Sequence, residues 1–205
     1  MTICEAKPVI RYFFSVVVVA LAVQTNPAFA QKADLPAVKV GDRWTFKVSE
    51  AGAKADRHWV VTSVTPDRIE GTENAKPLAL TPELNEIESP RGKDSNRKLL
   101  SFPLEVGKKW DFADEYVLLG NKRSTRANVT VTGYGKIRVP AGEFDAFKLE
   151  AKSVWMNRKE NVAGDYSARY WYAPVARAIV KFASESNLPI RPPVSYELIK
   201  LELRP

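Results

Sequence analysis

The chain has 205 residues, with 31 Lys and Arg against 24 Asp and Glu, and its formal net charge is +7. The basic residues are spread along the chain rather than clustered on one element, so the charge does not predict a nucleic-acid-binding protein. The single cysteine, Cys4, lies in the N-terminal segment. The rest of the chain therefore has no cysteine for a disulfide, a thiolate metal site or a cysteine nucleophile.

Residues 1–30 have the pattern of a secretory signal peptide. Lys7 and Arg11 form a basic start, an apolar run follows, and the segment ends with Ala-Phe-Ala, which predicts cleavage directly after it. The apolar run is shorter than the ~20 residues of a membrane-spanning helix, and an uncleaved N-terminal anchor is the alternative. We expect residues 31–205 to form a single domain located in a bacterial periplasm.

A β-hairpin is predicted at residues 133–151. Apolar residues lead into Pro140-Ala141-Gly142, where proline fixes one turn dihedral and glycine permits a positive φ. From Phe147 to Ala151, apolar and charged residues alternate, and this period of two marks a strand with one buried face.

Further β-prone runs, separated by turn residues, predict an antiparallel meander. The predicted strands lie at residues 41–48, 58–64, 68–71, 106–112, 126–132, 166–172, 178–182 and 196–203. The expected fold class is therefore mainly β: a curved antiparallel sheet, either a half-barrel or a sandwich, with at most one or two short helices.

The best helix candidate is residues 81–88, because Thr81 can cap a helix and Pro82 suits its first position. Two basic segments, residues 91–98 and 122–126, are expected to be solvated loops. The alternative for these segments is a weak contact with an anionic surface, such as phospholipid head groups or envelope polysaccharide.

One short motif occurs twice. Residues 40–46 and 106–112 both read V-G-x-x-W-x-F. The repeat suggests a sheet with two similar halves. The alternative is that a glycine turn followed by a tryptophan is simply a common way to start a strand.

No motif for catalysis, phosphate binding or metal binding is present in the sequence. The only histidine, His58, lies in a predicted strand, where a surface or packing role is expected. Carboxylates are scattered, and a paired-carboxylate hydrolase is the minority alternative. We therefore predict a protein that is not an enzyme and that carries no cofactor and no metal.

Aromatic residues are the remaining functional signal. They are expected either to fill a β core or to line an apolar cavity within a curved sheet. The candidate lining residues are Trp44, Phe46, Trp110, Phe112, Trp155, Trp171 and Tyr172.

Several segments carry a resemblance to a known family. They are Gly41-x-x-Trp44-x-Phe46, Phe102-Pro103-Leu104, Gly107-x-x-Trp110, residues 139–150, Trp171-Tyr172-Ala173-Pro174 and Ile179-Val180-Lys181. In these segments the chain resembles exported bacterial proteins grouped as TapB-like domains of unknown function. The resemblance implies a curved antiparallel sheet like that of periplasmic lipoprotein carriers, and it brings no catalytic residues. Where the family pattern has a glycine, this chain has Ala176-Arg177-Ala178.

Two functions follow as hypotheses. The first is a non-enzymatic periplasmic protein that binds a lipid, a lipoprotein or another apolar ligand on a concave sheet. The alternative is an accessory module of the cell envelope with a solid core, which contacts a partner protein through a sheet edge or its basic loops. Both hypotheses allow peripheral contact with a membrane and neither involves nucleic acid.

Overall fold

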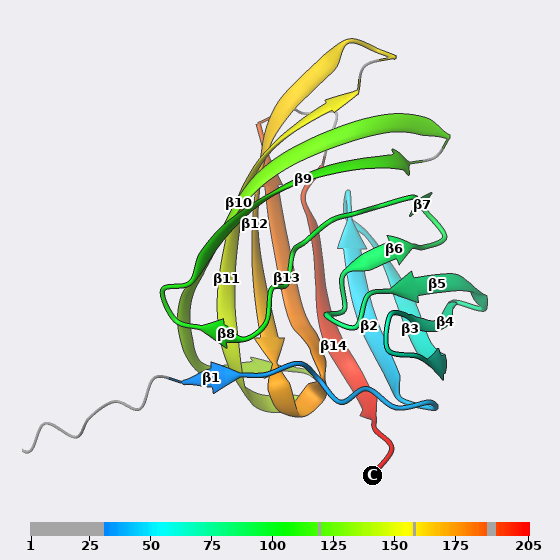
Figure 1. The fold of residues 1–205 in the computed structure, drawn as a ribbon, viewed down its shortest axis with the longest axis vertical. Helices are drawn as coiled ribbons and strands as arrows, with labels where there is room; N and C mark the ends of the chain where they lie inside the picture. Colours follow the sequence, from blue (N-terminus) through cyan, green and yellow to red (C-terminus); the bar gives the residue numbers. More distant parts are fainter. Residues whose placement is uncertain (1–30, 119, 158, 188–191) are drawn as a thin grey trace, which may run out of the picture.

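The computed structural model describes residues 31–118, 120–157, 159–187 and 192–205, and most of these residues lie in β-strands (Figure 1). Two short strands, β1 and β8, pair with each other, and the other twelve form one antiparallel sheet. The strands are β1 (Lys32–Ala33), β2 (Arg43–Glu50), β3 (Ala53–Val64), β4 (Ile69–Glu73), β5 (Lys76–Leu80), β6 (Glu86–Glu88), β7 (Gly92–Lys93), β8 (Leu104–Glu105), β9 (Lys109–Leu118), β10 (Asn121–Val139), β11 (Gly142–Asn157), β12 (Val162–Ala173), β13 (Ala178–Ser186) and β14 (Val194–Glu202). The predicted signal peptide lies outside the described residues.

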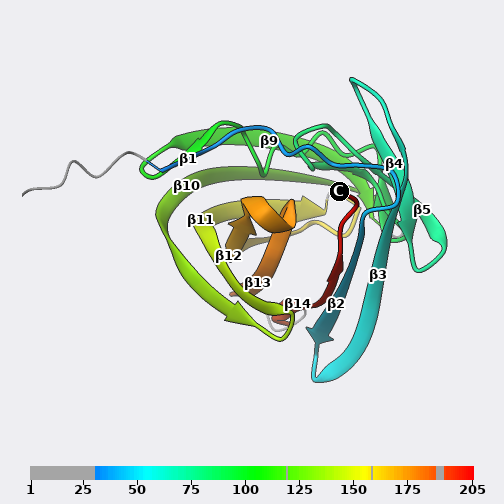
Figure 2. The same ribbon diagram turned by 90° about the horizontal axis from the view of Figure 1, so that it is seen from below.

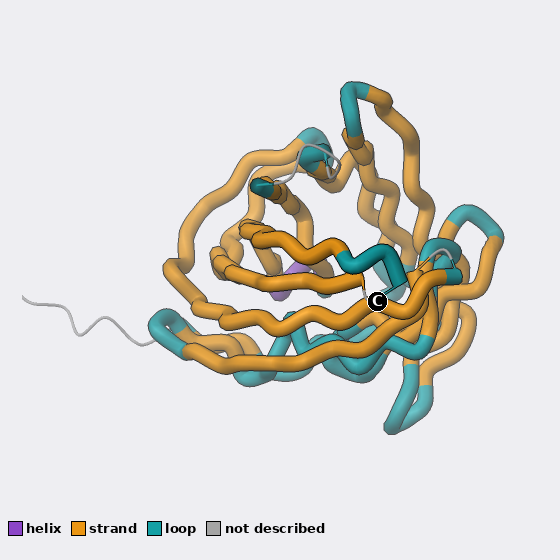
Figure 3. Tube along the Cα trace, turned by 90° about the horizontal axis from the view of Figure 1, so that it is seen from above, coloured by secondary structure: helices purple, strands orange, loops and turns teal. Residues whose placement is uncertain are grey.

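The large sheet curves until its two edges meet. Its strand order is β6-β5-β4-β3-β2-β14-β13-β12-β11-β10-β9-β7, so the two edge strands, β6 and β7, are consecutive in the chain. Ser89 and Gly92 form an antiparallel bridge at this seam, and the Ser95 amide donates to the Ile87 carbonyl at 3.1 Å. The sheet is therefore nearly closed into a barrel (Figures 2 and 3), and the predicted fold class is confirmed.

The predicted hairpin is the longest strand pair of the sheet. β10 and β11 pair from Arg123 opposite Asn157 down to Val139 opposite Gly142, and the turn lies between the last two residues. At this end the Ala141 amide donates to the Leu198 carbonyl at 3.0 Å, so the hairpin also contacts β14.

The two copies of V-G-x-x-W-x-F start β2 and β9 with the same backbone geometry. Gly41 has a φ of +89° and donates to the Val61 carbonyl at 2.9 Å. Gly107 has a φ of +91° and donates to the Val131 carbonyl at 2.8 Å. Residues that carry a side chain rarely adopt this φ, which explains why both copies have glycine there.

A fully buried carboxylate, Asp42, joins three distant segments. Asp42 accepts hydrogen bonds from the Lys39 amide at 3.0 Å, from Arg177 Nη1 at 2.9 Å and from the Arg204 amide at 2.8 Å. Arg177 follows the 3₁₀ turn η1 (Pro174–Ala176) and has a φ of +51°. Arg177 thus combines a left-handed backbone with an ion pair to the buried Asp42.

The prediction of a helix at residues 81–88 is wrong. The segment forms a turn in which the Leu84 amide donates to the Thr81 carbonyl, and Leu84 has a φ of +64°. The buried Asn85 side chain exchanges two hydrogen bonds with the Leu100 backbone, at 2.7 and 2.8 Å. This contact fixes the turn, and the chain then continues as β6.

The expectation of a solvated loop at residues 122–126 is also wrong. The segment lies within β10 and pairs with both β9 and β11. The neighbouring strands satisfy its backbone, so its high charge does not prevent strand formation. In the other basic segment, residues 91–98, only Gly92–Lys93 is a strand and the remainder is irregular.

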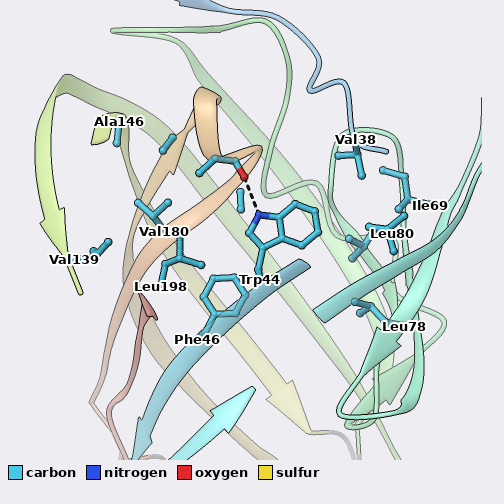
Figure 4. Packing of buried hydrophobic residues seen from close by; sticks show 14 residues of the cluster. Val38, Trp44, Phe46, Ile69, Leu78, Leu80, Val139, Ala146, Val180 and Leu198 are labelled. Carbon is cyan, nitrogen blue, oxygen red and sulfur yellow. Dashed lines mark hydrogen bonds between the residues drawn. The ribbon is translucent and has the colours of Figure 1, made fainter. Parts of the chain in front are cut away.

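Two clusters of buried apolar residues form the core. The first surrounds Trp44 and Phe46 and includes Leu198 (Figure 4). Trp44 Nε1 donates to the Ala176 carbonyl at 2.8 Å, which attaches the 3₁₀ turn to this cluster. The second cluster surrounds Phe147 and includes buried residues of β10, β11 and β12.

Candidate functional site

The seven predicted lining residues separate into buried and partly exposed groups. Trp44, Phe46, Trp155 and Tyr172 are at most 4% exposed. Trp110, Phe112 and Trp171 are only partly buried at the margins of the two core clusters.

Trp171 and Tyr172 lie on opposite faces of β12, as neighbours in a strand do. Tyr172 packs in the second core cluster and its ring contacts Phe102 at 5.2 Å. Trp171 pairs with Lys181, whose Nζ lies 5.8 Å from the Trp171 ring. Lys181 also pairs with Glu197 at 2.6 Å, on the face away from Tyr172. The structure therefore does not bring these two predicted residues to one surface.

A continuous row of aromatic rings crosses the concave face of the sheet. Tyr170, Phe182, Tyr196, Phe46 and Trp59 come from five neighbouring strands, β12, β13, β14, β2 and β3. Successive ring centroids are 5.0, 5.1, 5.2 and 5.4 Å apart. These distances are typical of favourable aromatic pairs. Of the predicted residues, only Phe46 belongs to this row.

Two arginines lie against the row and differ in their partners. Arg57 lies 5.9 Å from the Tyr196 ring and pairs with Glu73 at 3.4 Å. Arg97 lies 5.9 Å from the Tyr170 ring, and its Nη2 donates to the Tyr170 hydroxyl at 2.7 Å. Within the described residues, no carboxylate lies within ion-pair distance of Arg97.

The Arg97 side chain is partly buried, and its guanidinium is incompletely hydrogen-bonded. Its Nε atom is inaccessible and has no hydrogen-bond partner among the described residues. Proteins generally pair a charge that is withdrawn from water with a group of opposite sign at close range. Arg97 has no carboxylate within ion-pair distance among the described residues, and this makes it a candidate ligand-binding residue.

The electrostatic surroundings keep Arg97 charged. Burial by itself lowers the pKa of the Arg97 guanidinium, but interactions with Tyr170, Tyr166, Glu86 and Asp114 outweigh burial and hold the pKa above its ordinary range. Arg97 is therefore a permanent cation on the concave face.

Burial also raises the pKa of the phenol of Tyr196, in the middle of the row, above its ordinary range. Tyr196 is consequently neutral at pH 7 and can act as a hydrogen-bond donor.

The loop that carries Arg97 is held by side-chain hydrogen bonds. Trp110 Nε1 donates to the Lys98 carbonyl at 2.7 Å. Asp114 accepts from the Asn96 amide at 2.9 Å and from the Ser95 hydroxyl at 3.2 Å. The β9 side chains thus position the loop, and the predicted residue Trp110 supports the site through the backbone next to Arg97.

Sequence reasoning placed Arg97 in a solvated basic loop and missed it as a site residue. Its own segment, residues 91–98, contains four bases and gives no sign that one of them turns inward. The contact with Tyr170 spans 73 positions of the chain, so only the fold brings the two residues together.

The only histidine, His58, is exposed, and its Nδ1 lies 3.2 Å from the Thr45 hydroxyl. Within the part of the chain that the structure describes, no three His, Cys, Asp or Glu side chains are grouped as a metal site. In the same part, no helix has the length and apolarity needed to cross a membrane.

Comparison with known proteins gives similarity at the level of the fold. No protein-family model matches the chain, and no curated protein matches it significantly. The chain is similar to solved structures, among them the following three. A provisionally described lipoprotein from Parabacteroides distasonis has a TM-score of 0.53 and 12% identity, over 82% of this chain and 98% of that one.

The second structure is a provisionally described exported protein with a YmcC-like fold from Bacteroides fragilis. It has a TM-score of 0.54 and 14% identity, over 83% of this chain and 99% of that one. The third is the hypothetical lipoprotein YmcC from Escherichia coli, with a TM-score of 0.50 and 7% identity, over 78% and 84% of the two chains. The resemblance to TapB-like domains stays a prediction. The chain shares its fold with bacterial proteins described as exported or as lipoproteins.

Proposed function

We propose that this protein is a non-enzymatic periplasmic binding protein whose ligand is an amphiphile with an acidic group. The acidic group pairs with Arg97, and the apolar part of the ligand lies along the aromatic row. The observation that carries this proposal is the partly buried Arg97 guanidinium, which has no carboxylate within ion-pair distance in the described part of the chain.

The chemistry of the surroundings supports an acidic ligand. A guanidinium binds a carboxylate or a phosphate through paired N–H donors, and among the described residues the Arg97 guanidinium makes one hydrogen bond, from Nη2 to the Tyr170 hydroxyl. Tyr170 and Phe182 beside it are apolar core residues, 3% and 8% exposed, so a hydrocarbon chain that lies against their rings has to displace part of their present packing.

The comparisons agree with this setting without specifying the ligand. The similar structures are described as exported proteins or lipoproteins, which suits a role in the cell envelope. Free fatty acids and anionic phospholipids share the required chemistry, so both belong to the proposed ligand class.

Binding can be tested with dansyl-labelled undecanoic acid and the exported protein, purified from the periplasm without detergent. We expect fluorescence enhancement on binding and displacement by unlabelled fatty acids. Arg97→Met should weaken binding at least about ten-fold, because a charged hydrogen-bonded pair is worth roughly 1.5–3 kcal/mol. Arg97→Lys should retain part of the affinity.

Arg43→Met is the matched control, because Arg43 is an exposed arginine on β2. This variant should bind the probe like the wild type. Equal displacement by a fatty alcohol and a fatty acid of the same length would contradict the proposal. Displacement by phosphatidylglycerol but not by free fatty acid would identify the phospholipid as the ligand source.

A further inference from the structure

Exposed aliphatic side chains gather at one end of the large sheet. Seven large apolar residues are exposed in the described part of the chain, and five of them belong to this group. The five are Leu35, Val40, Val64, Val106 and Val175, and together they define the basal surface. A single exposed apolar residue is ordinary, but a group of them at one end indicates an interaction surface.

The strand order places these five residues at the same end. β2 and β9 are separated by five antiparallel strands, so they run in the same direction and begin at the same end. β12 runs opposite to both, so the η1 turn that follows it lies at this end, which Figure 2 views. β3 pairs antiparallel with β2, so its last residue, Val64, lies beside the start of β2.

The repeated motif contributes its first residue to the basal surface in both copies. Val40 and Val106, each directly before the glycine with a positive φ, are more than half exposed. The turn into the strand requires the glycine, but it does not require an aliphatic side chain that contacts water. An exposed valine in both copies therefore points to a contact outside the chain.

The charge around the basal surface is positive. Residues 31–43, 64–68, 104–109 and 174–177 carry the five aliphatic side chains and contain seven basic and four acidic residues. Two of these carboxylates already have partners within the same segments. Asp34 pairs with Lys32 at 3.6 Å, and the buried Asp42 pairs with Arg177 at 2.9 Å.

Lysines adjoin both motif valines. Lys39 directly precedes Val40, and Lys108 and Lys109 follow Val106 after one glycine. Lysine side chains beside aliphatic ones are typical of protein surfaces that contact anionic lipid, because the ammonium groups reach the head groups while the aliphatic groups leave water. The composition of the basal surface therefore favours a membrane as its partner.

The chain that precedes the described residues joins the domain at this same end. Residue 31 lies directly before β1, and β1 pairs with β8, which leads into the start of β9. Residues 1–30 contain the apolar run of the predicted signal peptide. Whenever that run is inserted in a membrane, the basal surface is the part of the domain next to the attachment point.

We infer that the basal surface contacts an anionic membrane directly, with its aliphatic side chains between lipid head groups and its lysines on lipid phosphates. This contact lies beyond the proposed amphiphile binding and does not depend on Arg97.

The test measures co-sedimentation of the exported protein with vesicles made of equal parts of phosphatidylglycerol and phosphatidylcholine. A triple variant, Val40→Ser with Val106→Ser and Val175→Ser, should weaken vesicle binding at least about ten-fold without any change of net charge. Wild-type binding should also weaken at high salt and on vesicles of phosphatidylcholine alone.

The matched control removes exposed apolar side chains elsewhere. Val154→Ser with Met156→Ser alters the two exposed apolar residues of β11 and should leave vesicle binding within about two-fold of the wild type. Circular dichroism checks that both variants fold. The triple variant and Arg97→Met should also separate, since Arg97→Met should bind vesicles like the wild type.

A fluorescent label gives an independent readout. The described residues contain no cysteine, so Val175→Cys and Met156→Cys each provide one position for an environment-sensitive dye. Vesicles should increase the fluorescence of the label at position 175 and leave that of the label at position 156 unchanged.

A wild type that does not bind the vesicles would overturn the inference, and so would equal binding by the triple and control variants. Loss of vesicle binding in Arg97→Met but not in the triple variant would overturn it in favour of lipid uptake at the amphiphile site. A dimer that the triple variant dissociates, without vesicle binding, would overturn it in favour of self-association.

Discussion

The two copies of V-G-x-x-W-x-F have the same backbone but different surroundings. In each copy a glycine with φ near +90° donates to the carbonyl of a valine on the adjacent strand. Trp44 of the first copy is buried, and its Nε1 donates to the Ala176 carbonyl within the apolar core. Trp110 of the second copy is partly exposed and donates to the Lys98 carbonyl instead.

The difference separates a tryptophan that packs in the core from one that holds the backbone next to Arg97. The first copy organises packing around Trp44. The second copy holds the loop that places Arg97 on the concave face. One strand-starting motif can therefore serve either purpose, depending on which segment lies over its tryptophan.

The largest expected effect distinguishes the two tryptophans directly. Trp44→Ala should lower the free energy of unfolding by about 3–5 kcal/mol, because it leaves a large cavity in the core. Trp110→Ala should cost only about 1–2 kcal/mol, mainly through the lost hydrogen bond to the Lys98 carbonyl. Urea denaturation of both variants measures the difference, and equal losses would contradict the division of roles.

Replacement of the two arginines beside the aromatic row should destabilise the protein to different extents. Arg57→Met should lower the free energy of unfolding more, because Glu73 loses a cation that lies 3.4 Å away. Arg97→Met should lower it less, because Arg97 has no carboxylate within ion-pair distance among the described residues and interacts with Glu86 and Asp114 at longer range. Thermal unfolding of the ligand-free variants measures the difference, and an equal or larger loss in Arg97→Met would show that Arg97 serves the fold rather than a ligand.

The two glycines should differ by a smaller amount. Gly41→Ala and Gly107→Ala should each cost about 1–2 kcal/mol, since alanine is strained at their positive φ. An added Cβ at Gly41 would lie 2.7 Å from Arg204 Nε, whereas none of the atoms around Gly107 would lie within 4 Å of it. Gly41→Ala should therefore be the more costly by a few tenths of a kcal/mol, and an Arg204→Ala background should remove the difference.

The smallest expected effect concerns pH and the loop contact of Asp114. Burial, only partly offset by hydrogen bonds from Asn96 and Ser95, raises the pKa of Asp114 above 3.8. A raised carboxyl pKa in the folded state means that protonation favours folding. Asp114→Asn should therefore be the more stable protein at pH 7, and this advantage should shrink as the pH falls through the folded-state pKa of Asp114.

Thermal melts of the wild type and of Asp114→Asn between pH 7 and pH 4 measure this gap in stability. A gap that widens on acidification would show that the charged form of Asp114 stabilises the fold through its contact with the loop.

Local sequence patterns predict most strands, but they do not predict that the loop at residues 91–98 directs the Arg97 side chain toward Tyr170. The hairpin at Pro140-Ala141-Gly142 is confirmed because alternation and turn residues are adjacent in the chain. The helix at residues 81–88 is wrong because the Asn85 contact with Leu100, from a distant segment, outweighs local helix signals.

The aromatic prediction has a similar limit. The alternation of apolar and polar residues predicts which aromatic side chains point to the same face of a strand. It does not predict which strands are neighbours in the sheet. The row from Tyr170 to Trp59 depends on the pairing of β14 with β2, which joins the two ends of the chain. Of the residues in or beside this row, the sequence predicts Phe46 as a lining residue but does not predict Arg97.

The most direct test of the account is native mass spectrometry of the wild type and Arg97→Met, both exported and purified without detergent, followed by organic extraction. The account predicts that the wild type carries an acidic amphiphile at near-stoichiometric occupancy and that Arg97→Met does not. A wild type that carries no ligand and shows no mass shift after incubation with fatty acids or phosphatidylglycerol would contradict amphiphile binding. Equal occupancy in both proteins would contradict the role of Arg97.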